Sequence, residues 1–257
     1  MNVLNMANSI RYFIGNWKMF GVPSSYRIIE KINGYLKKDK KNNKKYQVVI
    51  APPFTLLQEF SKKFKNKEIS ISAQNCYHKD NFAAHTGHVS PLMIKSLGVK
   101  YIILGHSENR MSGETDEVIK LKVELALKNN FKVIFCIGEN KTEKRKNKTF
   151  YVLKKQLYNV LKKKLNSKKL IIAYEPVWSI GTGKLPSRAE LIYTKRQIKS
   201  NLAKIFKSNI PPVLYGGSVD SNNISFFKDI RAIDGFLIGG ASKSSKNFID
   251  IIKNFYK

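Results

Sequence analysis

The chain is poor in the features that mark secreted or membrane-bound proteins. Its 257 residues include 2 cysteines, Cys76 and Cys136, which are too few for a disulfide framework and do not have the spacing of metal ligands. No apolar run approaches the roughly 18 residues of a membrane-spanning helix. Residues 1–11 lack the continuous apolar segment of a secretory signal. These absences predict a soluble, cytoplasmic protein of a reducing compartment, with no membrane partner.

Acidic residues are scarce as well. The chain has 18 Asp and Glu against 47 Lys and Arg, so its formal net charge is +29 at pH 7. One interpretation is a nucleic-acid surface, because clustered basic side chains bind phosphates. The other is a lysine-enriched surface without a function, which the even spread of lysine and the lack of interleaved aromatic platforms favour. We expect no nucleic-acid partner, although this charge would speed the encounter with an anionic substrate.

Short apolar runs alternate with longer amphipathic stretches along the whole chain. The runs are apolar throughout, as in parallel strands covered by helices, and stretches such as 115–130 and 150–166 have apolar residues at three- and four-residue spacing. Eight such units in about 250 residues predict an α/β protein, a single (β/α)8 TIM barrel. We expect one domain, 1–257, with a short N-terminal extension over 1–11. The expected strands are 12–16, 47–51, 69–74, 101–104, 132–136, 170–174, 212–215 and 235–238.

Polar and glycine residues follow several of the expected strands. The active sites of such barrels lie at the carboxyl ends of the strands, so these residues should meet at one rim. Packing alone does not require a ring of this kind. The residues are Asn16 and Lys18 after the first run, His106 after the fourth, Glu175 after the sixth, Ser218 after the seventh, and Gly239 and Gly240 after the eighth.

The most informative segment covers residues 173–184. It reads Ala173-Tyr174-Glu175-Pro176-Val177-Trp178-Ser179-Ile180-Gly181-Thr182-Gly183-Lys184. A stiff Pro-Val-Trp start and a glycine-containing tip are typical of a hinged lid. A carboxylate that a lid closes off from water becomes a stronger base, suited to removing a proton next to a carbonyl group.

The lid and three further segments resemble the triosephosphate isomerase family. The three are Gly15-Asn16-Trp17-Lys18, Leu104-Gly105-His106-Ser107-Glu108 and Tyr215-Gly216-Gly217-Ser218. The resemblance extends from Phe13 to the C-terminus. It implies the interconversion of dihydroxyacetone phosphate and D-glyceraldehyde 3-phosphate by proton transfer through an enediolate, a step of glycolysis and gluconeogenesis that also connects to the pentose shunt. It further implies a homodimer that uses no cofactor and no metal ion.

The resemblance assigns a role to each catalytic residue. Glu175 is expected to be the base. His106 is expected to be a neutral electrophile whose pKa is lowered by a helix N-terminus, an arrangement established for this family. Lys18 would stabilise the enediolate and the substrate phosphate. Asn16 would hold Lys18 and offer its amide to the substrate oxygen, and Glu108 would pair with Lys18.

Substrate binding and lid closure are expected to use a further set of residues. Phosphate binding needs closely approaching backbone N–H groups, which glycine permits, and the candidates are Gly181, Ser218, Gly239 and Gly240. The lid and its latch are expected to include Pro176, Trp178, Lys184, Pro186 and Tyr215. In the family, the residue aligned with Pro186 donates its backbone N–H to the tyrosine matching Tyr215. Proline has no N–H, so this latch lacks its donor.

The remaining expectations concern support and assembly. Cys136 is interpreted as a packed strand-end thiol, and Thr86 as a residue that enters the active-site region of a second subunit. The family's Thr-Gly-Glu reads Thr86-Gly87-His88 here, and the family's arginine is Asn109. Because the two charges that commonly pair across the dimer interface are lost together, no unpaired buried charge remains, and we still expect a dimer.

Two other interpretations were weighed against this one. An inactive relative that serves as a binding scaffold should lack at least one of Lys18, His106 and Glu175, and all three are present. A barrel that has acquired polyanion binding through its charge would bind nucleic acid in a salt-dependent way.

Overall fold

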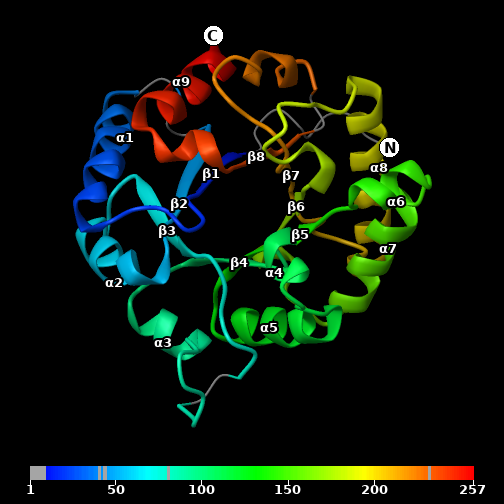
Figure 1. The fold of residues 1–257 in the computed structure, drawn as a ribbon, viewed down its shortest axis with the longest axis horizontal. Coiled ribbons are helices and arrows are strands. Elements are labelled where there is room, and N and C mark those ends of the chain that lie inside the picture. The colour runs from blue at the N-terminus through cyan, green and yellow to red at the C-terminus, as the bar shows by residue number, and fades with distance from the viewer. Residues whose placement is uncertain (1–9, 40–41, 43–44, 80–81, 231–232) are drawn as a thin grey trace.

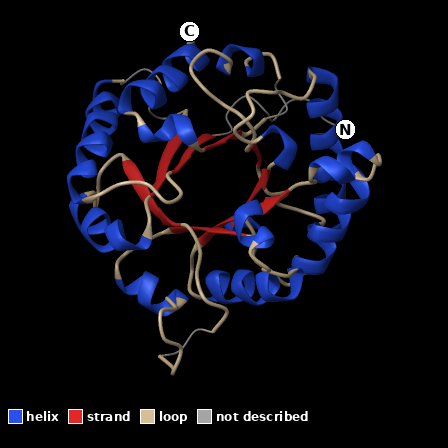
Figure 2. Cartoon of the chain, in the orientation of Figure 1, coloured by secondary structure: helices blue, strands red, loops and turns tan. Residues whose placement is uncertain are grey.

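Eight parallel strands close into a barrel that helices surround (Figure 1, Figure 2). The computed structural model describes residues 10–257 except 40, 41, 43, 44, 80, 81, 231 and 232. The strands follow one another around the barrel in chain order, and β1 pairs with β2 on one side and β8 on the other. The expected (β/α)8 barrel is confirmed. The strands are β1 (Arg11–Asn16), β2 (Tyr46–Ala51), β3 (Ile69–Ala73), β4 (Tyr101–Leu104), β5 (Lys132–Ile137), β6 (Leu170–Tyr174), β7 (Val213–Tyr215) and β8 (Gly235–Ile238).

The helices cover the outside of the barrel with their apolar faces. In α1 the buried side chains Ile29, Ile32 and Leu36 recur at three- and four-residue spacing, which places them on one face. The helices are α1 (Tyr26–Lys38), α2 (Phe54–Lys63), α3 (Pro91–Ser96), α4 (Ser107–Met111), α5 (Asp116–Lys128), α6 (Lys141–Arg145), α7 (Thr149–Val160), α8 (Arg188–Phe206) and α9 (Ser245–Tyr256).

The hydrophobic core has two layers, one on each face of the strands. Neighbouring residues of β1 illustrate this: Phe13 belongs to the larger cluster and Ile14 to the smaller one, and both are fully buried. Because successive side chains of a strand point to opposite faces, the smaller cluster fills the barrel and the larger one lies between strands and helices. This double burial explains why the strands read as continuous apolar runs.

The structure shifts five of the expected strands by one residue at one end, and α5 begins and ends one or two residues inside 115–130. The helix expected over 150–166 is α7, which ends at Val160, because Leu161 leaves the helix with φ −92° and ψ 138°. The side chain of Leu161 is 2% exposed, so the turn out of the helix places it in the core. Most of the expected extension 1–11 lies outside the described residues, and Arg11 already belongs to β1.

The carboxyl ends of the strands carry the segments of interest. The lid follows β6, and the segment between β3 and α3 projects beyond the ring of helices (Figure 1). α8 begins directly after the lid with a reciprocal cap, in which the side chains of Ser187 and Glu190 each accept a backbone N–H of the other residue. This cap fixes the start of α8, where the lid segment ends.

Candidate active site

Glu175 and His106 face each other at the rim of the barrel. Glu175 follows β6 and His106 follows β4, and Oε1 of the glutamate lies 3.2 Å from Nε2 of the histidine. They are 2% and 5% exposed, respectively. A Cβ at Gly216 would lie 2.8 Å from Cγ of Glu175, so glycine there makes room for the carboxylate. The backbone N–H of Glu175 donates to the carbonyl of Ile137 at 2.8 Å, which fixes the root of this side chain.

The contacts of its two ring nitrogens determine which of them carries the proton in neutral His106. His106 caps α4, and its Nδ1 accepts the backbone N–H of Glu108 at 3.2 Å, a bond that requires an unprotonated Nδ1. The neutral ring therefore carries its proton on Nε2, which faces Glu175. Burial lowers the pKa of His106, but the carboxylates of Glu175 and Glu108 outweigh burial and raise the pKa above its ordinary value. The expected lowering of this pKa is wrong, because the helix end is only one of several charges around the ring.

Lys18 is held in the same site by three neighbours. Its Nζ lies 2.7 Å from Oε1 of Glu108, the ion pair expected from the sequence. Its backbone N–H donates to Oδ1 of Asn16 at 3.0 Å, and its carbonyl accepts from Gln74 at 3.0 Å. Lys18 has a φ of 55°, which is uncommon for a residue other than glycine. Strain of this kind persists where surrounding contacts hold it, so Asn16 and Gln74 fix the direction of the lysine side chain.

One cavity of about 430 Å³ joins these residues to the expected phosphate-binding segments. Lys18 and Lys243 line it together with Glu175 and Asp220, so the cavity carries charges of both signs as well as glycine backbone. A Cβ at Gly239 would lie 3.6 Å from Cε of Lys18, so the lysine side chain runs close to the glycines that follow β8. The expected site residues that line this cavity are Asn16, Lys18, His106, Glu175, Gly181, Ser218, Gly239 and Gly240.

The first arm of the lid is held by a buried carboxylate. Pro176 is buried and starts the arm, and the indole N–H of Trp178 donates to Oε1 of Glu139 at 2.8 Å. The hydroxyl of Tyr174 also donates to Oε1 of Glu139, at 3.2 Å. Burial raises the pKa of Glu139, although the hydrogen bonds from Trp178 and Tyr174 oppose the rise. Glu139 thus fixes the indole at the hinge.

The second arm meets the loop after β7 through a serine. The hydroxyl of Tyr215 lies 3.0 Å from Oγ of Ser179, and Oγ of Ser179 donates to the carbonyl of Lys184 at 2.5 Å. Pro186 is buried beside this arm. The latch tyrosine therefore has a partner that is not the backbone of residue 186.

The two remaining expected residues lie outside the cavity. Cys136 is fully buried in β5, as expected of a packed thiol, and burial together with the nearby Glu175 carboxylate raises the pKa of its thiol. Thr86 is exposed on the segment that projects between β3 and α3 (Figure 1). This position leaves its side chain accessible to a second molecule.

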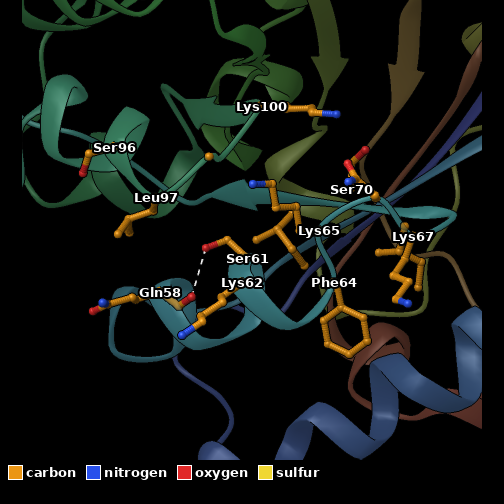
Figure 3. Close-up of a pocket in the computed structure, with 14 residues that line it drawn as sticks. Gln58, Ser61, Lys62, Phe64, Lys65, Lys67, Ser70, Ser96, Leu97 and Lys100 are labelled. Atoms are coloured by element: carbon orange, nitrogen blue, oxygen red, sulfur yellow. Dashed lines mark hydrogen bonds between the residues drawn. The ribbon is translucent and has the colours of Figure 1, made fainter.

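A second cavity lies at the opposite ends of the strands. It measures about 560 Å³ and is lined by residues near the starts of β3 and β4, among them Lys65, Lys67 and Lys100 (Figure 3). None of the described residues that line it is among the catalytic residues expected from the sequence. Its wall of flexible lysines lacks the facing acid and histidine of the first cavity.

Two features are absent from the described part of the chain. There, no group of three or more His, Cys, Asp and Glu side chains is arranged to hold a metal ion. No helix in that part is long and apolar enough to cross a membrane.

Sequence reasoning missed three residues of this site: Gln74, Glu139 and Ser179. Gln74 and Glu139 each follow a strand, as do the residues that were found, so their position was a usable signal. Ser179 gave none, because a serine within a lid is an ordinary loop residue.

Comparisons with known proteins agree with this geometry. A model of the triosephosphate isomerase family matches residues 11–255. The triosephosphate isomerase of Caldanaerobacter subterraneus subsp. tengcongensis is 37% identical over 245 residues, covering 93% of this chain and 96% of that protein. The triosephosphate isomerase of Debaryomyces hansenii is 39% identical over 249 residues, covering 95% and 98%. The crystal structure of triosephosphate isomerase from Bartonella henselae matches with a TM-score of 0.87 at 30% identity, covering 96% of this chain and 99% of that one. The chain belongs to the triosephosphate isomerase family.

Proposed function

We propose that Glu175, His106, Lys18 and Asn16 catalyse the interconversion of dihydroxyacetone phosphate and D-glyceraldehyde 3-phosphate, the reaction of the chain's family. The observation that carries this proposal is the approach of Glu175 to His106, 3.2 Å between Oε1 and Nε2, inside a cavity beneath a lid. A base and a hydrogen-bond donor at this spacing suit proton removal next to a carbonyl group.

Each step of the reaction has a residue in a suitable place. Glu175 takes a proton from the carbon beside the carbonyl group, and the Nε2–H of His106 donates to the carbonyl oxygen. Lys18 stabilises the negative charge of the resulting enediolate. The hydroxyl proton of the enediolate passes to the former carbonyl oxygen, and Glu175 returns its proton to the neighbouring carbon. The ketose thus becomes an aldose with no net change in oxidation state. Oδ1 of Asn16 accepts the backbone N–H of Lys18, and the side-chain NH₂ of Asn16 is offered to the substrate oxygen.

The substrate phosphate is proposed to bind at the glycine-containing end of the cavity. Gly181, Ser218, Gly239 and Gly240 line this end. Their backbone N–H groups can approach a phosphate closely, and the ammonium of Lys18 adds charge. Pro176, Trp178 and Lys184 belong to the lid that excludes water while the enediolate exists.

The active form is proposed to be a cytoplasmic homodimer. Support comes from Thr86, which is exposed on a projecting segment and would reach the active-site region of the second subunit. We still predict that the protein does not bind nucleic acid, despite its net charge of +29.

A coupled assay of the purified protein tests the proposal. With D-glyceraldehyde 3-phosphate in deuterium oxide, we expect rapid turnover and product with deuterium on the carbon next to its carbonyl group, because a proton on Glu175 exchanges with solvent. An absence of turnover would favour the inactive scaffold and contradict the proposal.

A further inference from the structure

Ser179 lies where the two arms of the lid meet the barrel. It is the last residue of the 3₁₀ turn Val177–Ser179 and is fully buried. Its hydroxyl donates to the carbonyl of Lys184 at 2.5 Å, which joins the first arm to the second. A serine hydroxyl has one hydrogen, so the hydroxyl of Tyr215, 3.0 Å away, must be the donor to Oγ of Ser179.

The backbone of Ser179 takes part in a second connection. Its carbonyl accepts from the hydroxyl of Ser218 at 2.6 Å, and the same Ser218 oxygen accepts the N–H of Gly183 at 3.2 Å. The backbone N–H of Ser218 lies 3.5 Å from Oγ of Ser179. A Cβ at Gly217 would lie 2.8 Å from that same Oγ, so glycine leaves room for this packing. The hydroxyl and the carbonyl of Ser179 thus connect the lid to the loop after β7.

The second arm cannot make the Tyr215 contact itself. Pro186 is buried beside the arm and has no backbone N–H to donate. Among the residues that the structure describes, Ser179 is the only hydrogen-bond partner of the Tyr215 hydroxyl. A buried hydroxyl without a partner is destabilising, so the Tyr215 hydroxyl depends on Ser179 for its hydrogen bond.

We propose that Ser179 latches the lid of this chain: its hydroxyl oxygen accepts from Tyr215, and this contact replaces the one that a backbone N–H at position 186 would make. Ser179 is a positioning residue, because its side chain reaches the lid and Tyr215 rather than the cavity. The proposal rests on the isomerase chemistry proposed above.

A loosened lid has a chemical consequence. In an exposed enediolate the C–O bond to phosphate breaks with its electron pair, inorganic phosphate leaves, and the remaining enol is converted to methylglyoxal by proton transfer. This elimination consumes no oxidant or reductant. The ratio of methylglyoxal formed to substrate isomerised therefore measures how well the closed lid retains the enediolate.

Three variants test the latch. Ser179→Ala removes the hydroxyl and leaves Tyr215 unpaired. Thr182→Ala is the matched control, because the hydrogen bonds that its hydroxyl makes to described residues, Trp178, Ser179 and Lys184, all stay within the lid. Ser179→Ala combined with Pro186→Ala restores a backbone N–H at 186 that can donate to Tyr215. For each variant we would measure the methylglyoxal ratio and the binding of phosphoglycolate, a carboxylate that mimics the enediolate.

We expect Ser179→Ala to weaken phosphoglycolate binding roughly tenfold and to raise the methylglyoxal ratio by a similar factor. Thr182→Ala should change both by less than about twofold, and the double variant should recover part of the loss. Equal effects of Ser179→Ala and Thr182→Ala, no effect of Ser179→Ala, or no recovery in the double variant would overturn the latch. A wild-type protein without isomerase activity would instead refute the proposed function.

Discussion

Shortening Glu175 by one methylene tests its role as the base. The backbone of Glu175 is fixed by its 2.8 Å hydrogen bond to Ile137. An aspartate in this backbone cannot move forward, so Glu175→Asp withdraws the carboxylate by roughly 1–1.5 Å, about one C–C bond. A displacement of this size should lower kcat on the order of 10²-fold, or about 2.7 kcal/mol of the barrier.

Steady-state kinetics in both directions would measure this loss. KM should change little, since the phosphate-binding end of the cavity is untouched, and the thermal midpoint should stay close to wild type. Glu59→Asp is the matched control, because Glu59 is exposed on α2 and loses the same methylene. A Glu175→Asp protein with near-normal kcat would remove Glu175 from the role of base.

Three other predictions concern the charge at the rim, the hinge and the assembly. Lys18→Ala should raise KM and lower kcat together, because the lysine faces both phosphate and enediolate, and normal steady-state kinetics would disprove its assignment. Burial raises the pKa of Glu139, so its contribution to the free energy of unfolding is present at low pH and is lost as pH rises through the raised pKa. Urea titrations between about pH 4 and pH 7 should therefore show Glu139→Gln gaining stability relative to wild type as pH rises, and a constant difference would contradict this. Sedimentation at micromolar concentration should show a dimer, and a stable monomer would refute the role of Thr86 in assembly.

The barrel could be predicted from the sequence because both faces of its strands are buried. Each run is apolar without alternation, and β4, β6 and β8 have the bounds expected. The end of α7 could not be predicted. Its helical spacing continues past Val160, and only the tertiary position of Leu161 in the core turns the chain out of the helix.

The meeting of the proposed catalytic residues at one rim could be predicted because each follows a strand, and parallel strands bring those ends together. The effect of these residues on one another's pKa values could not be predicted. His106 stands at a helix start in the sequence, which by itself predicts a lowered pKa.

The charge that reverses this effect comes from a strand distant in the chain. The pairing of β4 with β5 and of β5 with β6 aligns Leu104 with Phe135 and Ile137 with Tyr174. That register brings the end of β6 beside the end of β4, so Glu175 meets His106 at 3.2 Å. The same reasoning applies to Ser179, whose partner Tyr215 ends β7. A sequence motif can identify the side chains of such a site, but their pKa values and hydrogen bonds depend on the strand register of the barrel.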